Sequence, residues 1–396
     1  MTTWLRGGSS YGPAGATFTS ATHSGDGQVT ITYTSPVTQT ATTLASSANP
    51  SVAGPAVTYT ATVSPVPDGG TVAFTDGGAT ITGCGAVPVD TSTGRATCQV
   101  TYTSAGTHSI TAAYSGDTAY AASTSAPLTQ TVSQAATTTV VSSSANPSTV
   151  GQAVTFTATV SPQPPGAGTP TGTVTFADGT TQLGTATLSG GTAMLTTSSL
   201  AAGTHSITAT YGGDGNFTGS TSAALTQTVN KIATTTTVAS SANPSVAGQQ
   251  VTYIGTVTPA PDGGTVTFDD GGTAICGAVA VSTSGSSAGT AACPVTYTST
   301  GSHSITASYS GDSVYGPSAT ASPLDQTVNQ AATSTSLAAA PDPSVSGHPV
   351  TFTATVSVTA PGAGTPAGTV TFSEGTAILG TGTLSTSGGQ ARATFS

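Results

Sequence analysis

The sequence predicts an all-β fold made of tandem antiparallel Greek-key β-sandwiches, and two observations support this prediction. First, the segment Gly203–Asp214 recurs almost unchanged at Gly106–Asp117 and at Gly301–Asp312. Second, residues alternate within this segment, so that one face of an extended strand carries four of them: His205, Ile207, Ala209 and Tyr211. Half-buried strands separated by Gly, Pro, Ser and Asn turns, with no helical period, are typical of packed antiparallel sheets.

Two landmarks give the length of the repeating unit. An Asn-Pro-Ser or Asp-Pro-Ser turn returns at intervals of 97, 97 and 99 residues, starting at Asn49, Asn146, Asn243 and Asp342. The histidines of the recurring segment are 97 and 98 residues apart. A unit of about 100 residues can enclose its own core in a sandwich, whereas solenoid repeats of about 20 to 50 residues cannot fold alone.

These landmarks divide the chain into five segments. We expect the tail of a glycine-rich upstream module at 1–37, repeats at 38–133, 134–231 and 232–330, and a truncated fourth repeat at 331–396. The last segment lacks the strand that contains histidine and tyrosine, and Met1 is not expected to be the natural start. Because each closing strand runs almost directly into the next opening strand, we expect a monomeric rod with short joints.

The second repeat shows the expected strands most clearly. Residues 154–160 alternate strictly between apolar and Thr positions, as a half-buried strand should. Residues 183–188 and 193–197 are expected to form a hairpin around Ser189–Gly191. With an opening strand at 137–142, a strand at Val174 and Phe176, the His205 strand and a closing strand at 225–229, the repeat has seven strands.

Composition excludes several classes of partner. Charged residues make up 5% of the chain, against about 25% in average soluble proteins, and the net charge is −10. An acidic chain with four Lys and Arg is not expected to bind nucleic acid or an anionic membrane surface. No apolar run reaches the length of a membrane span, so we expect no membrane insertion. Residues 1–30 lack the pattern of a signal peptide, so any export signal is expected outside this sequence.

The four cysteines are expected to form two local disulfides, Cys84 with Cys98 and Cys276 with Cys293. Aligning the repeats places the two members of each pair opposite Leu183 and Leu195 of the second repeat. The loops of 14 and 17 residues would each contribute about 3 kcal/mol. Free buried thiols or a metal pair are the alternatives, and the spacing disfavours metal. A disulfide indicates an oxidising, extracellular or cell-surface location.

The recurring histidines are the candidates for catalysis, since Ser and Asp stand near each of them. Each histidine, however, shares a strand face with Ile, Ala and Tyr. A catalytic residue seldom recurs in every copy of a structural repeat, so we predict no catalytic residue. Six residues are therefore interpreted as structural members of the core strand: His108, Tyr114, His205, Tyr211, His303 and Tyr309.

The aspartates after this strand are candidates for a calcium site. Asp117, Asp214 and Asp312 are isolated, whereas calcium prefers six to eight oxygen ligands. We therefore interpret them as turn caps, and we predict no metal and no cofactor. Lys231 is the single lysine, which excludes Lys-Asn cross-links as a general feature of the repeats.

Three motifs together resemble a known family. They are Asn-Pro-Ser-x-x-Gly, the Gly-Thr-Val-Thr-Phe sequence at Gly172–Phe176, and Gly-Thr-His-Ser-Ile-Thr-Ala-x-Tyr-x-Gly-Asp. Over about residues 40–396, they are similar to bacterial immunoglobulin-like domain repeats of the group 3 type. The resemblance implies immunoglobulin-like sandwiches in an exported protein, secreted or on the cell surface.

The leading functional hypothesis is a non-catalytic, adhesion-associated spacer or stalk. A second hypothesis is that the repeats themselves bind an extracellular glycan or protein, for which the candidate aromatic residues are Tyr120, Phe217 and Tyr315. These three occupy equivalent positions, so filling a joint between neighbouring repeats is the other interpretation. A third hypothesis is a non-catalytic appendage of a secreted hydrolase.

Overall fold

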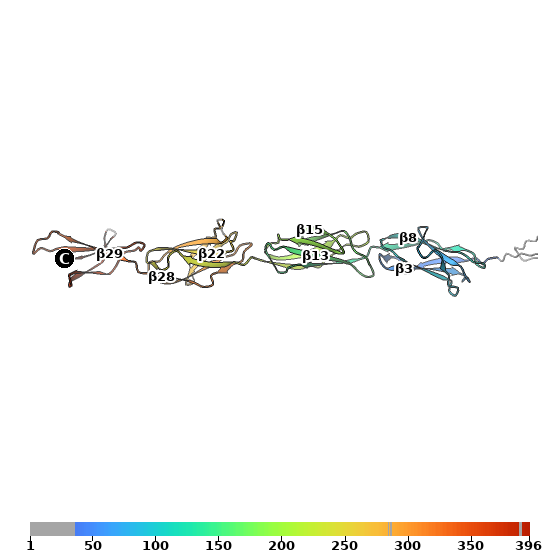
Figure 1. Cartoon of the computed structure of the whole chain (residues 1–396), viewed down its shortest axis with the longest axis horizontal. Coiled ribbons are helices and arrows are strands. Elements are labelled where there is room, and N and C mark those ends of the chain that lie inside the picture. The colour runs from blue at the N-terminus through green and yellow to red at the C-terminus, as the bar shows by residue number, and fades with distance from the viewer. Residues whose placement is uncertain (1–35, 284, 286, 388–389) are drawn as a thin grey trace, which may run out of the picture. The chain divides into compact units, whose positions relative to one another are not determined.

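The structure is a computed structural model that describes residues 36–396, except 284, 286, 388 and 389 (Figure 1). All regular secondary structure in these residues is β, which confirms the predicted fold class. We use the names repeat 1 to repeat 4 for residues 38–133, 134–231, 232–330 and 331–396. Most of the predicted upstream tail, residues 1–35, lies outside the described part of the chain.

The strands follow one scheme in the first three repeats. Repeat 1 contains β1 (Ala41–Ser46), β2 (Ser51–Val52), β3 (Ala56–Ser64), β4 (Thr71–Asp76), β5 (Ala79–Thr80), β6 (Val87–Pro88), β7 (Arg95–Thr101), β8 (Gly106–Tyr114), β9 (Ser123–Thr124) and β10 (Leu128–Ser133). Repeat 2 contains β11 (Thr137–Ser143), β12 (Ser148–Thr149), β13 (Val154–Pro162), β14 (Thr173–Asp178), β15 (Thr181–Thr187), β16 (Thr192–Thr197), β17 (Gly203–Tyr211), β18 (Ser220–Thr221) and β19 (Leu225–Asn230).

Repeat 3 contains β20 (Thr235–Ser240), β21 (Ser245–Val246), β22 (Gln250–Thr258), β23 (Thr265–Asp270), β24 (Thr273–Ala280), β25 (Gly289–Thr296), β26 (Gly301–Tyr309), β27 (Ser318–Ala319) and β28 (Leu324–Asn329). The described residues of repeat 4 form β29 (Thr333–Ala340), β30 (Thr351–Val358), β31 (Thr369–Glu374), β32 (Ala377–Thr383), β33 (Ser385–Ser387) and β34 (Gln390–Phe395).

Each of the first three repeats consists of two sheets. In repeat 1 the strand orders are β1-β3-β7 and β2-β10-β8-β4-β5, and repeats 2 and 3 have the corresponding orders. Neighbouring strands in each sheet are often distant in sequence, as in a Greek-key sandwich. One pairing in each repeat is parallel, that of the short β2 with the closing strand β10 and its counterparts β12 with β19 and β21 with β28.

The predicted hairpin in repeat 2 is wrong. β15 pairs with β14 and β16 pairs with β13, so the two strands belong to different sheets. The turn around Gly190 therefore carries the chain from one sheet to the other. The tight turn at Gly179 already joins β14 to β15 in a hairpin, and alternation alone does not show which of two turns joins paired strands.

The core has the alternation that the sequence predicts. In β17, Ile207, Ala209 and Tyr211 are buried, and their counterparts in β8 and β26 are buried too. They face aromatic residues of the strands beside and opposite them, of which Phe156 and Phe176 are fully buried in repeat 2. Each repeat thus has an apolar core of its own.

Threonine hydroxyls attach the opening strand of each repeat to the opposite sheet. Thr40 Oγ1 and Thr42 Oγ1 lie 2.7 and 2.8 Å from Ser123 Oγ of β9. The same triplet recurs in repeat 2 as Thr137, Thr139 and Ser220, and in repeat 3 as Thr234, Thr236 and Ser318. Some of the abundant threonine in this chain is therefore buried and hydrogen-bonded rather than exposed.

The described residues of repeat 4 form two sheets, β29-β30-β34-β33 and β31-β32. They contain no counterpart of β26 and β28. A groove of about 600 Å³ lies between the sheets, and Leu337, Phe352, Val370 and Phe372 contribute to its lining. Phe352 and Phe372 match the buried Phe156 and Phe176 of repeat 2, so the groove occupies the position of a sandwich core.

Candidate functional site

The recurring Asn-Pro-Ser turn binds the last strand of its own repeat. In repeat 1, Asn49 Nδ2 donates to the carbonyl oxygen of Thr129 at 2.7 Å, and the amide of Thr131 donates to Asn49 Oδ1 at 3.0 Å. Asn243 makes the same two bonds in repeat 3. In repeat 2, the amide of Thr228 donates to Asn146 Oδ1. The side chain of this asparagine thus makes the two hydrogen bonds that the backbone of a paired strand would otherwise make with the last strand.

A fully buried glutamine in the closing strand completes this contact. Gln130 is 0% exposed, and its Nε2 donates to the carbonyl oxygen of Ala48 at 2.9 Å and to Ser51 Oγ at 3.2 Å. Its Oε1 accepts a 2.7 Å bond from Ser46 Oγ of β1. Gln227 and Gln326 are also 0% exposed and bond the equivalent serines Ser143 and Ser240. Such a buried amide is tolerated because its hydrogen bonds are satisfied.

The parallel strand pair lies next to these side chains. Ser51 and Val52 pair with Val132 and Ser133, so the start and the end of a repeat lie side by side. We call this arrangement the terminal clamp. In repeat 1 it comprises Asn49, Ser51, Gln130 and Val132. It joins a short strand near the start of the repeat directly to the last strand.

The histidines lie one strand away, and each shares a hydrogen bond with an aspartate at the same end of the core. His108 is the cross-strand partner of Gln130. Its Nδ1 lies 2.7 Å from Asp76 Oδ2, and the same distance separates His205 from Asp178 and His303 from Asp270. The hydrogen bond with His205 lowers the pKa of Asp178. Each aspartate ends the strand that pairs with the histidine strand.

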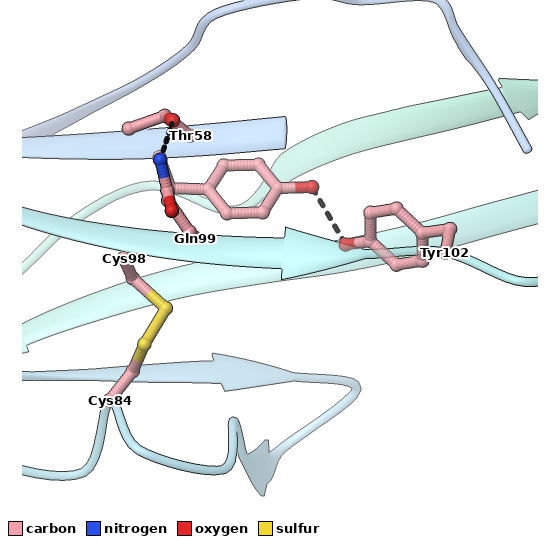
Figure 2. Close-up of a disulfide and its surroundings, with 6 residues drawn as sticks. Thr58, Cys84, Cys98, Gln99 and Tyr102 are labelled. Atoms are coloured by element: carbon pink, nitrogen blue, oxygen red, sulfur yellow. Dashed lines mark hydrogen bonds between the residues drawn. A yellow bond between two sulfur atoms is a disulfide. The ribbon is translucent and has the colours of Figure 1, made fainter. Parts of the chain in front are cut away.

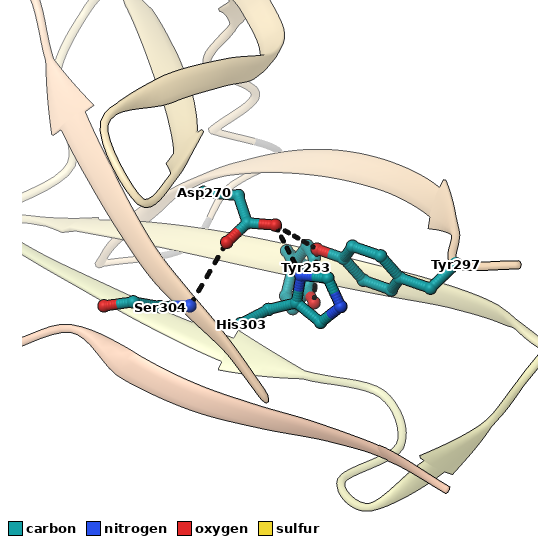
Figure 3. Close-up of polar contacts among 5 residues, drawn as sticks. All are labelled: Tyr253, Asp270, Tyr297, His303 and Ser304. Atoms are coloured by element: carbon teal, nitrogen blue, oxygen red, sulfur yellow. Dashed lines mark hydrogen bonds and ion pairs between the residues drawn. The ribbon is translucent and has the colours of Figure 1, made fainter. Parts of the chain in front are cut away.

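Tyrosines cover the histidines of repeats 1 and 3. The rings of Tyr297 and His303 are stacked with centroids 3.7 Å apart, and Tyr102 lies 4.1 Å from His108. Figure 3 shows Asp270 accepting bonds from Tyr297, His303 and the backbone amide of Ser304. The carboxylate of Asp270 thus binds one ring nitrogen of His303, and Tyr297 covers one face of the ring. This packing suits a structural role for the histidine.

The structure contains the disulfides Cys84–Cys98 and Cys276–Cys293 (Figure 2). Beside the first, Tyr59 and Tyr102 share a 2.7 Å hydroxyl hydrogen bond, and burial followed by this bond raises the pKa of Tyr59. The alignment of Cys84 and Cys276 with Leu183 is wrong. Cys276 is the cross-strand partner of Phe268, as Gly184 is of Phe176.

The two cysteines of a disulfide therefore stand where repeats 2 and 4 have a glycine packed against a large side chain. A Cβ atom at Gly184 would lie 2.9 Å from Leu195 Cδ1, and one at Gly380 would lie 2.2 Å from Phe395 Cε2. Repeats 2 and 4 thus fill with Leu195 or Phe395 the space that the disulfides occupy in repeats 1 and 3. Counted from Asp178 and Asp270, which end β14 and β23, Gly184 and Cys276 are both six residues further along, so Cys276 matches Gly184 and not Leu183.

The aspartates after the histidine strand cap their own turns. Asp117 Oδ1 accepts the amides of Ala119 and Tyr120, both at 2.8 Å. Asp214 does the same and also accepts the amide and hydroxyl of Thr171 at 2.8 Å. Although burial opposes it, this set of bonds lowers the pKa of Asp214 to about 2. The described residues contain no cluster of three metal-ligating side chains.

A family profile described as bacterial Ig-like domain (group 3) matches residues 42–133, 141–230 and 236–329, which is more than half of the chain. The chain belongs to the bacterial Ig-like domain (group 3) family. The resemblance found in the sequence is thereby confirmed. No curated protein matches this bacterial Ig-like chain. No helix that could span a membrane occurs in the described part of it.

Several solved structures resemble the bacterial Ig-like chain. The D1–D4 ectodomain fragment of ICAM-5 has 14% identity and a TM-score of 0.36, and the match covers 88% of this chain and 91% of the fragment. The I-band fragment I67–I69 of titin has 11% identity and a TM-score of 0.29, with 73% and 99% covered. The Escherichia coli adhesin FdeC has 16% identity and a TM-score of 0.27, with 73% and 96% covered.

The clamp glutamines were placed in the closing strand by the sequence, but their role was missed. The signal was present, since Gln130 stands between Leu128 and Val132 on the apolar face, and the other two copies have the same pattern. A polar residue kept on a buried face in every copy indicates an internal hydrogen-bond network. The histidine partners were also missed, although an Asp-Gly pair follows the same strand in each of the three repeats, as at Asp178.

The tyrosine that ends the histidine strand offers a matched test within this bacterial Ig-like chain. Tyr114 donates to Asp117 Oδ2 at 2.6 Å and contacts the carbonyl oxygen of Gly69 at 3.0 Å. The hydroxyl of Tyr211 is buried and makes no hydrogen bond of ordinary length among the described residues. Burial, and after it the nearby carboxylate of Asp214, raises the pKa of Tyr211 to about 12. We expect Tyr114→Phe to lower the free energy of unfolding of repeat 1 by about 1 to 2 kcal/mol.

Tyr211→Phe is the control, and we expect it to change the stability of repeat 2 by less than about 0.5 kcal/mol. Hydrogen exchange of the full chain in denaturant, followed by mass spectrometry, gives the stability of each repeat separately. Equal losses in the two variants would show that the hydroxyl bonds of Tyr114 do not stabilise repeat 1.

Proposed function

We propose that this chain is a non-catalytic, tension-bearing spacer or stalk of an exported protein, with residues 38–133, 134–231 and 232–330 as its mechanical units. The observation that supports this most directly is the terminal clamp, which recurs in repeats 1, 2 and 3. Its parallel pairs join Ser51 to Val132, Ser148 to Val229 and Ser245 to Val328. A domain that only presents a binding loop has no need to reinforce the contact between its two ends.

The geometry of the clamp explains how it resists tension. When a repeat is stretched, β2 is pulled toward its N-terminus and β10 toward its C-terminus. The two strands are parallel, so these pulls are opposed along the strand axis and load the backbone bonds in shear, all at once. The bonds of Asn49 and Gln130 lie beside them and share the load. Unfolding under force depends on the unfolding barrier, which bonds of this kind raise.

We propose an extracellular or cell-surface location. Two disulfides in a chain of bacterial Ig-like domains support an extracellular or cell-surface site, since cytoplasmic thiols are kept reduced. A stalk there holds another module away from the cell, and an adhesive module is the use that we propose. The His–Asp pairs support no catalytic role, because tyrosine rings cover His108 and His303.

The glycan- or protein-binding alternative gains no support from its candidate residues. Tyr120, Phe217 and Tyr315 each form a parallel bridge with a residue of the joint that precedes their own repeat, the partners being Thr38, Ala135 and Ile232. Phe217 is 3% exposed. Tyr120 and Tyr315 are half-buried and pack against the cores of their own repeats, so the three side chains do not form an exposed binding platform.

Stretching single molecules of the full chain tests the spacer function. We expect three distinct unfolding events under non-reducing conditions, one for each complete clamp. After reduction, the extension released when repeats 1 and 3 unfold should grow by about 43 and 54 Å. The reason is that 14 and 17 residues are released at about 3.5 Å each, less the 5.8 and 6.0 Å that the disulfides already span between Cα atoms. The event of repeat 2 should keep its length. The length change thus identifies which repeat has unfolded.

Asn146→Ala removes a clamp bond from repeat 2. It should lower the unfolding force of repeat 2 alone, whose event is recognised because its length does not change on reduction. An exposed substitution in the same repeat, Met194→Ala, is the matched control, since this residue is 62% exposed. A chain that extends smoothly without force peaks, or an Asn146→Ala chain that unfolds at the forces of the control, would exclude the tension-bearing role.

A further inference from the structure

One loop alternates in length from repeat to repeat. The loop between β3 and β4 has six residues, and so has the loop between β22 and β23. The corresponding loops of repeats 2 and 4, at 163–172 and 359–368, have ten residues. Both long loops contain the sequence Pro-Gly-Ala-Gly-Thr-Pro. The disulfides alternate in the same phase, since they occur in the repeats with short loops.

The long loop of repeat 2 contacts repeat 1. The amide of Ala167 donates to the carbonyl oxygen of Ala53 at 3.3 Å, beside the turn that follows the clamp. A Cβ atom at Gly54, where φ is +110°, would lie 2.6 Å from both the Cβ and the amide nitrogen of Ala167. The amide of Gly54 is itself bonded to Tyr102 of its own repeat at 2.9 Å. The loop therefore rests on a turn that only glycine can form.

The same contact occurs between repeats 4 and 3. The amide of Ala363 donates to the carbonyl oxygen of Ala247 at 3.2 Å. A Cβ atom at Gly248, where φ is +82°, would lie 2.3 Å from the carbonyl oxygen of Ala363. The amide of Gly248 is again held by a tyrosine, Tyr297, at 2.8 Å. Two separate pairs of repeats thus show the same docking of a Gly-Ala-Gly loop.

The long loops are also held against the joint between the repeats. A Cβ atom at Gly166 would lie 2.5 Å from the Cβ atom of Ala135, and one at Gly362 would lie 2.5 Å from that of Ala331. Ala135 is 1% exposed. In the first pair Asn216 adds two bonds, accepting the amide of Ala105 at 3.0 Å and donating to the carbonyl oxygen of Thr103 at 3.2 Å.

From these contacts we infer that the long loop is a docking element for the Ala-Gly turn of a preceding disulfide-bearing repeat, so that the array is assembled from two-domain modules. Repeats 1 and 2 form one module, and repeats 3 and 4 form the next. Repeat 3 has the short loop, in which no residue corresponds to Ala167. Closed joints therefore alternate with joints that have no docking loop. This inference does not depend on the tension-bearing role.

The single lysine of the chain makes the inference testable by trypsin. Lys231 lies in the joint before repeat 3, and its Nζ donates to the carbonyl oxygen of Asp312. Gln134 occupies the same place before repeat 2, and its Nε2 donates to the carbonyl oxygen of Asp214 at 2.6 Å. Gln134→Lys and Gln330→Lys therefore introduce matched cleavage sites into the joints before repeats 2 and 4 of the full chain.

We expect trypsin to cut the folded chain after Lys231 at least tenfold faster than at either introduced lysine. Each rate is divided by the rate at the same bond in the unfolded chain, which removes the effect of neighbouring residues. Because cleavage follows the opening of the joint, the ratio reports how firmly each joint is closed. Equal normalised rates at the three joints would overturn the inference.

Adding Gly54→Ala to Gln134→Lys should raise cleavage at the introduced site at least fivefold, because the methyl group displaces Ala167. Gly151→Ala is the matched control: its φ is +80°, and a Cβ atom there meets nothing within 4 Å. It should leave that rate unchanged. If Gly54→Ala unfolds repeat 1, replacing residues 163–172 of repeat 2 by the six-residue loop of repeat 3 gives the same test. Unchanged cleavage in this loop variant would also refute docking.

Discussion

We expect that reducing the two disulfides lowers the free energy of unfolding of repeats 1 and 3 by about 3 kcal/mol each and leaves that of repeat 2 unchanged. The expected size follows from the chain entropy that loops of 14 and 17 residues regain in the unfolded state. Hydrogen exchange of the full chain in denaturant, with and without a reductant, measures the three repeats side by side. Repeat 2 serves as the internal control, because its Gly184 and Leu195 stand at the positions of the cysteines.

Two double variants separate the cross-link from its packing. Cys84→Gly with Cys98→Leu transfers the arrangement of repeat 2 into repeat 1. In this variant the free energy of unfolding of repeat 1 should equal that of the reduced wild type. Cys84→Ala with Cys98→Ala should lose about 1 to 2 kcal/mol more, because both cysteines are buried and the smaller side chains leave a cavity. If reduction lowered the free energy of unfolding of repeat 2 as much as that of repeat 1, the disulfides would not be the cause of the loss.

We expect Gln130→Leu to destabilise repeat 1 by about 2 to 4 kcal/mol, although leucine has a similar volume and is more apolar. The substitution removes the bonds of Gln130 to Ala48 and Ser51, and it removes the shorter of the two bonds that the Ser46 hydroxyl makes, the other being to the carbonyl oxygen of Ala48. A buried polar group that loses its partner costs about 1 to 3 kcal/mol. Denaturant unfolding of the full chain, followed by hydrogen exchange, measures the loss in repeat 1.

Gln99→Leu is the matched control for this prediction. Gln99 lies on the exposed side of β7 in the same repeat and makes one long bond of 3.4 Å to Thr58, drawn in Figure 2. We expect this substitution to change stability by less than about 0.5 kcal/mol. A loss for Gln130→Leu no larger than that of Gln99→Leu would mean that the buried amide network does not hold the closing strand.

Gln130→Glu adds a pH test of the same network. The glutamate side chain at this fully buried position, once ionised, lacks the donor that Ala48 and Ser51 require. Burial raises the folded-state pKa of such a group above its unfolded value near 4.3. The loss of stability that Gln130→Glu causes in repeat 1 is therefore smallest below pH 4 and grows as the pH rises toward neutrality. A loss that is the same at pH 4 and pH 7 would contradict this account.

The difference between strand prediction and strand pairing appears clearly in repeat 2. Alternation located the strands around Leu183 and Leu195, because a half-buried strand requires apolar residues at every second position. It did not show that these strands belong to different sheets. Pairing depends on hydrogen bonds between segments distant in sequence, such as β16 with β13, and these leave no local pattern.

The sequence by itself determined the repeat length, the face of the histidine strand and the cysteine partners. Each depends on residues that are near in sequence or recur at one spacing, so that copies of the repeat inform one another. The tertiary structure alone decided the parallel pairing of Ser51 with Val132, the hydrogen bonds of Gln130 and the docking of Ala167 on Gly54. These contacts join parts of the chain about 80 to 110 residues apart, and only the packed sandwich brings them together.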